Sequence, residues 1–377
     1  MKLTKEEKNW ILYDVGNSAF TLLIATIMPL YFNYLAEQAG LSSVDYLAYW
    51  GYAACVLMGF AKQWLVFLVI YVIAKTGYSA SLIFYDSMLA DVTTADRMDQ
   101  VSSQGYAWGY IGSCVPFVVC LMIVLGAGKL GISIELAMGI SFFVTAAWWV
   151  LMTVPMLKTY RQKNYVERKP HAFRESFARI GKTFLNVRKE KKIFLFLLAF
   201  FFYIDGVYTI IDMATAYGSA LGLDSTGLLL ALLVTQIVAF PCAILFGRLA
   251  RRFRTEHLIT VCVVAYIGIA LFACVLRTQT QFWILAIFVG MFQGGIQALS
   301  RSYYAKIIPA EQSGEYFGLL DICGKGASFI GTAIVSVVSQ LTGDINKGVA
   351  MIVVLFVVGV VLFRIAVTCV QKNKIES

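Results

Sequence analysis

Charged side chains inside long apolar stretches are the residues of this sequence best placed to do chemistry. Asp205 and Asp212 stand seven residues apart in Ile193–Leu221, and Lys75 stands at the centre of Trp64–Leu89. In a helix such a pair shares one face, about 10 Å apart along the axis. A carboxylate there could bind a proton, a cation or the ammonium group of an amino acid, although a structural ion pair between helices fits equally well. Lys75 needs an anionic partner, and we expect Asp205 in that role.

Other polar groups in apolar stretches have weaker claims to a function. Asp321 and Lys325 stand one helical turn apart, where they can form a structural ion pair within one helix. Asp14, near the start of its stretch, is predicted to cap the helix or to hydrogen-bond near its end, and Asn17 could face a central cavity. Five neutral side chains could offer hydrogen bonds to a solute: Tyr203, Tyr208, Gln236, Gln293 and Gln297.

The sequence lacks the motifs of enzymes and of ATP-driven motors. The fragment Gly181-Lys182-Thr183 resembles a phosphate-binding loop but has no upstream glycine. The two histidines, His171 and His257, stand outside any HExxH pattern, and there is no GxSxG. The eight cysteines are isolated in apolar stretches without a CxxC pair. We therefore expect neither an enzyme nor a bound cofactor or metal.

The stretches that carry these residues are long enough to cross a bilayer. Of the 377 residues, 59% are hydrophobic and 14% are charged, and the mean hydropathy is +0.75. Soluble domains carry about 25% charged residues, and about 20 apolar residues span a bilayer as a helix. We expect an all-α integral membrane protein with spans within Trp10–Ala36, Trp64–Leu89, Gly105–Leu125, Ile132–Leu157, Ile193–Leu221, Gly227–Phe246, Leu258–Leu276, Phe282–Leu299, Tyr316–Leu341 and Val349–Val370.

The distribution of basic residues predicts the topology. Lys158–Lys192 carries twelve basic and three acidic residues, so the positive-inside rule places it in the cytoplasm. An eleventh apolar run, Tyr46–Ala61, has 16 residues and covers only about 24 Å as a helix. We expect it to be re-entrant or interfacial, which leaves both termini in the cytoplasm. The basic residues expected inside the membrane are Lys75, Lys325 and Arg364.

The same loop divides the chain into two helical halves. We expect an incomplete N-terminal bundle in residues 1–157, a basic cytoplasmic linker in residues 158–192 and a six-helix bundle in residues 193–377. Ser87–Gly112 and Ser302–Gly326 each lead from a helix end through a polar loop into a glycine-spaced helix. Such an internal echo is typical of transporters built from parallel repeats.

Several fragments together resemble one known family. They are WILYDVGNSAF at Trp10–Phe20, FYDSML at Phe84–Leu89, GYAWGYIG at Gly105–Gly112, YIDGVYTIIDMATAYG at Tyr203–Gly218 and GGIQALSRSYYAKIIP at Gly294–Pro309. The chain resembles the vacuole-effluxer-like branch of the major facilitator superfamily, whose fungal members are implicated in amino-acid release from the vacuole. The resemblance implies a two-bundle transporter that works by alternating access.

Compared with that family, the first half looks internally deleted. Two full helices and a gating loop are expected between the first helix and the Trp64 helix, but only Tyr46–Ala61 stands there. The corresponding gating loop of the second half is present, with the residues Gly247, Arg248, Arg251 and Arg252.

Two functions remain open at this point. The first is secondary active transport of a small solute, with an amino acid as one candidate solute and a proton as one candidate coupling ion. The alternative is a non-transporting remnant or membrane interaction protein. We expect a solute and the lipid bilayer as partners, no nucleic acid, and a place in the cell (plasma) membrane. The basic linker, with Phe173, Phe177 and Phe184 among its Arg and Lys, is either a topology signal alone or an amphipathic helix on anionic lipid.

Overall fold

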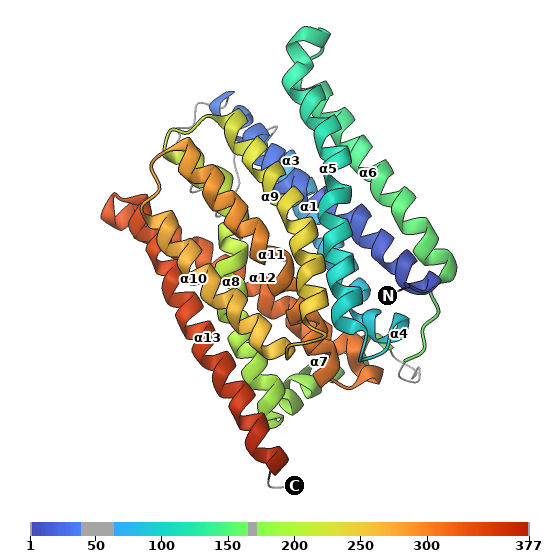
Figure 1. Ribbon diagram of the computed structural model, residues 1–377. Coiled ribbons are helices and arrows are strands. Elements are labelled where there is room, and N and C mark those ends of the chain that lie inside the picture. Colours follow the sequence, from blue (N-terminus) through green and yellow to red (C-terminus); the bar gives the residue numbers. More distant parts are fainter. Residues whose placement is uncertain (1, 39–63, 165–171, 376–377) are drawn as a thin grey trace.

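The computed structural model describes residues 2–38, 64–164 and 172–375, which form a bundle of long helices running alongside one another (Figure 1). The long helices are α1 (Lys5–Gln38), α3 (Trp64–Ser87), α5 (Met98–Leu130), α6 (Ile134–Thr159), α8 (Lys191–Ala220), α9 (Ser225–Leu249), α10 (Thr255–Cys274), α11 (Gln279–Ile307), α12 (Ser313–Thr342) and α13 (Ile345–Ile375). The shorter elements are α4 (Leu89–Val92), α7 (Ala172–Lys189) and the 3-10 turn η1 (Ala310–Gln312). The run Tyr46–Ala61 lies outside the described residues.

Within these ranges, each predicted apolar run coincides with a helix, and the ends of run and helix differ by at most eight residues. Eight helices of the described part are long and apolar enough to cross a membrane. The two remaining long helices, α1 and α3, have 34 and 24 residues. The all-helical membrane architecture expected from hydropathy is therefore confirmed, because each apolar run can satisfy its backbone groups in lipid only as a helix.

Within each half the first helix packs against later ones, and the two halves contact each other at a few places. In the first half α1 packs against α5 and α6, and in the second half α8 packs against α12 and α13. The halves meet where α9 and α11 pack against α5, and where α3 contacts α12. Most contacts between the two halves therefore come from residues of α3, α5, α9, α11 and α12.

The start of the chain lies beside the segment that follows α6. The Lys163 ammonium is 2.9 Å from a Glu6 carboxylate oxygen, and the backbone N–H of Asn164 donates to Asp91 at 2.8 Å. The N-terminal end of α1 and the C-terminal end of α6 are thus on one side of the bundle. In the described residues, four long helices, α1, α3, α5 and α6, lie between these two points.

Glu7 anchors the same end of α1. Its carboxylate accepts hydrogen bonds from Arg97 Nε at 2.9 Å and Arg97 Nη2 at 2.7 Å, and from the Thr93 hydroxyl at 2.8 Å. Burial by itself raises the pKa of this carboxyl, but the hydrogen bonds from Arg97, from the Thr4 backbone and from Thr93 outweigh it and leave the pKa below its ordinary value.

Candidate functional site

The guanidinium of Arg301 lies buried between the two halves. Arg301 stands near the end of α11, and only 4% of its side chain is exposed. Its Nη1 donates to Asp86 of α3 at 2.9 Å, while its Nε and Nη2 donate to the hydroxyl and the carbonyl of Ser102 of α5 at 2.9 and 3.0 Å. Its Nη2 is also 3.6 Å from the Asp14 carboxylate of α1. One cation of the second half thus contacts three helices of the first, and we name this group the Arg301 node.

Aromatic rings complete the surroundings of Arg301. The guanidinium carbon lies 4.8 Å from the ring centroid of Trp10, 5.3 Å from that of Tyr85 and 4.3 Å from that of Tyr106. The Tyr85 hydroxyl donates to Asp14 at 2.9 Å, and the Trp10 indole donates to the Tyr85 carbonyl at 3.0 Å. Cation–π attraction and two carboxylates therefore compensate the charge of Arg301 away from water.

Asp14 and Asn17, the two candidates that the sequence offers on α1, are both buried. Asp14 does not cap its helix; it is buried within the Arg301 node because Tyr85 and Arg301 hydrogen-bond and attract its carboxylate. Asn17, one turn along, is also buried, and its amide nitrogen has no hydrogen-bond partner among the described residues. Of the two candidates on α1, Asn17 is therefore the one whose side-chain N–H groups could donate to a solute.

A second polar node joins the halves around Asp99, in the first turn of α5. Its carboxylate accepts hydrogen bonds from the Ser302 hydroxyl at 2.6 Å and the Thr255 hydroxyl at 3.0 Å. The Lys306 ammonium approaches it to 2.5 Å. Ser302 and Lys306 follow Arg301 on α11, so both nodes close the interface between the halves at the end where α11 finishes.

The predicted gating loop contributes to this closed end through its glycine. A side chain at Gly247, near the end of α9, would begin 2.7 Å from Ser103 Cβ, so only glycine allows α9 to approach α5 this closely. Arg248, Arg251 and Arg252 are exposed. Of the four residues expected to gate the second half, Gly247 is the one whose backbone packs against the first half.

A second set of charges connects the Arg301 node to the middle of the bundle. The Asp321 carboxylate and the Lys325 ammonium form an ion pair one turn apart on α12. Lys325 also lies within electrostatic range of Asp86 and of Lys75 on α3, and Lys75 lies within range of Asp212 on α8. Charges of alternating sign thus extend along the contact between α3 and the second half.

Lys75 lies near Asp212 and not near Asp205, so the expected pairing of Lys75 with Asp205 is wrong. Asp212 is exposed and Lys75 is half-buried, and the structure records no direct ion pair between them. The Asp205 side chain turns instead toward α12, with no charged group acting on it among the described residues. Two carboxylates seven residues apart on α8 therefore have different surroundings, one facing a cation and the other facing backbone.

Asp205 is fully buried and only partly hydrogen-bonded. Its Oδ1 accepts from the backbone N–H of Gly331 at 3.0 Å and from the Thr209 hydroxyl at 3.3 Å. Its Oδ2 has no hydrogen-bond partner in the described part of the chain. A buried carboxylate without a cation is costly, and a proton on the unpartnered oxygen would remove that cost.

Gly331 is required for this arrangement, which gives a testable prediction. A Cβ at Gly331 would overlap Oδ1 of Asp205 and the hydroxyl of Thr209. We expect Gly331→Ala to lower the free energy of unfolding by about 1–3 kcal/mol, because overpacking forces neighbours to move. Gly318→Ala on the same helix is the control, since nothing lies within 4 Å of its Cβ. Thermal unfolding in detergent measures both, and equal melting temperatures for the two variants would contradict the packing.

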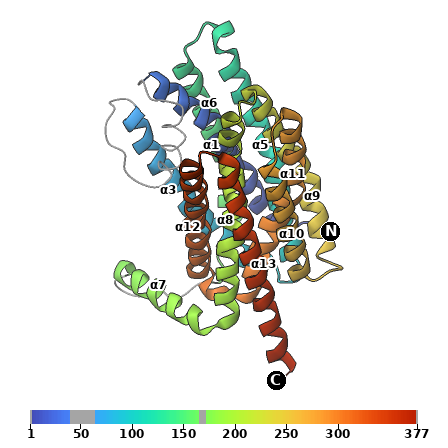
Figure 2. The same ribbon diagram turned by 90° about the vertical axis from the view of Figure 1, so that its left-hand side faces the viewer.

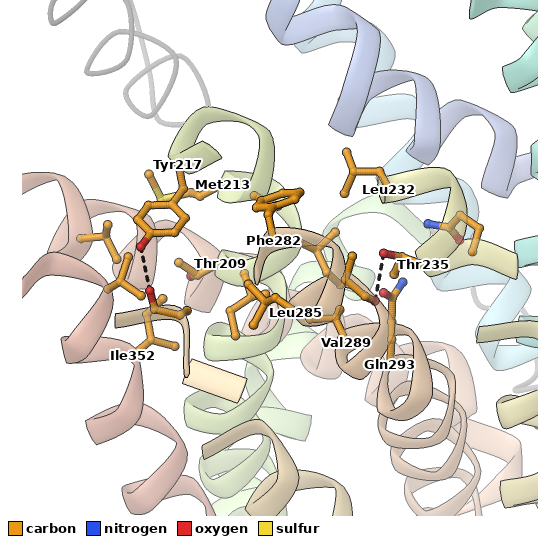
Figure 3. A pocket seen from close by; sticks show the side chains of 18 of the residues that line it. Thr209, Met213, Tyr217, Leu232, Thr235, Phe282, Leu285, Val289, Gln293 and Ile352 are labelled. Carbon is orange, nitrogen blue, oxygen red and sulfur yellow. Dashed lines mark hydrogen bonds between the residues drawn. The ribbon is translucent and has the colours of Figure 1, made fainter. Parts of the chain in front are cut away.

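Four of the neutral candidates lie in three different places. The Tyr203 hydroxyl is buried within the second half and bonds the Ser300 hydroxyl at 2.7 Å. Gln297 accepts from the Tyr110 hydroxyl of α5 at 3.4 Å. Gln293 and Gln236 instead line a largely apolar cavity of about 890 Å³, including its open part, between α8, α9, α11 and α13 (Figure 3). Its side chains shown in Figure 3 include Thr209, Met213, Tyr217, Leu232, Thr235, Phe282, Leu285, Val289 and Ile352.

Sequence reasoning missed Arg301, Asp86 and Asp99 as candidates. All three stand at helix ends next to polar loops, where a charge normally reaches water. Arg301 and Asp86 are 215 residues apart in the chain. The one available signal was that both occur inside fragments that carry the family resemblance, FYDSML and GGIQALSRSYYAKIIP.

Comparison with known proteins shows which family the chain belongs to. The family model described as vacuole effluxer Atg22 like matches residues 44–376. The chain belongs to this Atg22-like family. An MFS-type transporter of Bacillus subtilis, YxiO, described as uncharacterized, is 39% identical over 404 positions, with 96% of this chain and 94% of the relative covered. Autophagy-related protein 22 of Cryptococcus neoformans is 28% identical, with 78% of this chain but 54% of the relative covered.

Solved structures of transporters share the fold. The major facilitator transporter FucP in its outward conformation has a TM-score of 0.62 at 14% identity, with 96% of this chain and 97% of FucP covered. The human organic anion transporter MFSD10 has a TM-score of 0.58 at 12% identity, with 95% and 82% covered. This member of the Atg22-like family is therefore a multi-pass membrane protein with the major facilitator fold. Because its relatives are transporters, the expectation that it is not an enzyme is confirmed.

Proposed function

We propose that this protein moves a small zwitterionic solute, such as an amino acid, across the membrane by alternating access. The observation that supports this most directly is the pair of opposite charges on Lys75 and Asp212, which attract each other without a direct ion pair. An amino acid carries a carboxylate and an ammonium group, and the two would fit Lys75 and Asp212 respectively. Charges left accessible inside a membrane protein typically mark a substrate or ion pathway.

The two nodes supply the closed end that alternating access needs. The Arg301 node and the Asp99 group hold α11 to α3 and α5 at one end of the bundle. Opening of that end requires both nodes to separate while the opposite end closes, and bistable packing between two halves is a common route for such transitions. In this proposal the charges from Lys325 to Asp212 line the path above the closed end.

We propose Asp205 as the proton-coupling group, with Asp212 kept for the solute. The support is the unpartnered Oδ2 of Asp205 and the absence of a cation acting on it among the described residues. Protonation and deprotonation of such a group would change the contact between α8 and α12 at Gly331. The conformational equilibrium of the transporter would then depend on the proton gradient.

Counterflow of labelled amino acids into proteoliposomes tests the proposed function. Wild-type protein is expected to exchange a zwitterionic amino acid, with a rate that changes with pH. Asp205→Asn is expected to keep exchange but to lose most of its pH dependence, because an amide cannot titrate. Asp224→Asn is the matched control: this exposed residue caps α9, and asparagine caps helices equally well. An unchanged pH profile in Asp205→Asn would show that the coupling group lies elsewhere.

The alternative, a non-transporting protein, is favoured by one comparison. The alignment with YxiO extends over 404 positions, which leaves about 40 positions of the relative without a residue of this chain, the length of two membrane spans. That difference matches the internal deletion expected in the first half. Failure of the wild-type protein to exchange any amino acid, in liposomes where its folding is verified, would favour this alternative.

We also propose the orientation and the cellular membrane. Lys163, in the described part of the basic segment, contacts Glu6 at the start of α1, so the two lie on the same side of the bundle. The positive-inside rule supports a cytoplasmic position for that side, for both termini and for the closed end. We place the protein in the cell (plasma) membrane with that orientation.

A further inference from the structure

Helix α7 is the one described helix of ten residues or more that does not run with the bundle. It lies across the end of the molecule and projects beyond α12 (Figure 2). It contacts α8 and α12, and the Thr183 hydroxyl donates to Glu315 of α12 at 2.6 Å. Val187, one turn further, is buried in the core. These contacts fix which face of α7 is turned toward the bundle.

The rest of α7 presents apolar side chains away from the bundle. Phe184 and Leu185 are 61% and 59% exposed. Exposed apolar residues on the spanning helices face lipid tails, but α7 is not among the candidate spans of the described residues. Its apolar face therefore needs a different covering.

The charge of α7 and its position next to a membrane span indicate what covers its apolar face. Helix α7 carries five basic residues and one acidic residue, and Lys182, Arg188 and Lys189 are exposed. Glu190 alone separates α7 from α8, which begins a membrane span at Lys191. One residue reaches at most about 3.6 Å, so the end of α7 must stay at the membrane surface. A basic amphipathic helix at that level matches the headgroups of anionic lipids.

We propose that α7 is a binding site for anionic lipid headgroups. Phe184 and Leu185 enter the boundary between headgroups and acyl chains, while Lys182, Arg188 and Lys189 contact the phosphates. The hydrogen bond between Thr183 and Glu315 sets the rotation of α7 that allows both. This inference is independent of the transported solute, because it concerns a surface outside the path between the halves.

Hydrogen exchange of the full-length protein in nanodiscs tests this proposal. The bilayer is either phosphatidylcholine alone or phosphatidylcholine mixed with phosphatidylglycerol. Phosphatidylglycerol is expected to slow exchange of the α7 amides. Removal of one basic residue is expected to weaken the association of α7 with this lipid about fivefold. The triple variant Lys182→Gln, Arg188→Gln, Lys189→Gln is expected to lose the effect. The matched control, Lys2→Gln, Lys5→Gln, Lys8→Gln, removes three charges at the same end of the bundle and should keep it.

A further variant separates the apolar contribution from the charged one. Phe184→Ser is expected to speed exchange of the α7 amides in both bilayers, while amides of α5 and α11 report that the bundle is intact. Equal protection of α7 with and without phosphatidylglycerol would overturn the assignment to anionic lipid. Loss of protection in the control variant would overturn it as well, since net charge and not α7 would then be responsible.

Discussion

Replacement of Arg301 by alanine is expected to produce the largest loss of stability of any single substitution proposed. The variant would leave the carboxylates of Asp14 and Asp86 without the cation that compensates their charge. It would also leave a cavity where the Arg301 side chain packs against the rings of Trp10 and Tyr106. Breaking a buried ion pair by deleting one partner typically costs about 3–5 kcal/mol. The melting temperature of the detergent-solubilised protein measures this effect.

Two further variants make that result specific to the node. Arg301→Lys keeps the charge but loses the fork of hydrogen bonds to Asp86 and Ser102, so an intermediate melting temperature is expected. Adding Asp14→Asn and Asp86→Asn to the alanine variant should recover part of the loss, because the unpaired charges disappear. Arg277→Ala, at an exposed arginine, is the control. If Arg301→Ala melts like this control, the node contributes no net stability.

The largest loss of activity is expected from variants of Lys75 and Asp212. If each charge binds one charged group of the solute, Lys75→Met or Asp212→Asn removes an interaction of about 1.5–3 kcal/mol. That corresponds to a decrease of about 10–100-fold in apparent affinity or transport efficiency. Counterflow measured over a range of amino-acid concentrations gives this quantity.

The double variant distinguishes solute binding from a structural role. If Lys75 and Asp212 only compensate each other, Lys75→Met combined with Asp212→Asn leaves no unpaired charge and should recover transport. If they bind the solute, the double variant stays inactive although it folds. Recovery of counterflow in the double variant would therefore remove these residues from the proposed binding site.

The nodes also show how the described residues of the first half meet the second half. The family resemblance implies a gating loop between the second and third helices, and the chain has only Tyr46–Ala61 in that place. In the described residues the closing contacts come from α3, α5 and α11 instead, through Asp86, Asp99 and Arg301. The described residues therefore join the two halves at this end without a contribution from Tyr46–Ala61.

Interactions within one helix were predictable because their partners are close in sequence. Asp321 and Lys325 are one turn apart, so an ion pair between them follows from helix geometry alone. The basic linker likewise shows the spacing of an amphipathic helix in its sequence alone, and the structure has the helix α7 there. Asp205 and Asp212 show the limit of this reasoning, since helical spacing relates the two residues to each other but not to the helices that face them.

The membrane location, the all-helical class and the approximate helix bounds were determined by the sequence itself, because an apolar run of about 20 residues has no other stable backbone arrangement in lipid. Tertiary structure alone decided which charges meet. It placed Lys75 within electrostatic range of Asp212 and turned Asp205 toward Gly331. It also buried Arg301 against Asp86, 215 residues away. Such pairings depend on how each helix is rotated about its axis and on which distant segments it contacts. The spacing of residues within one segment determines neither.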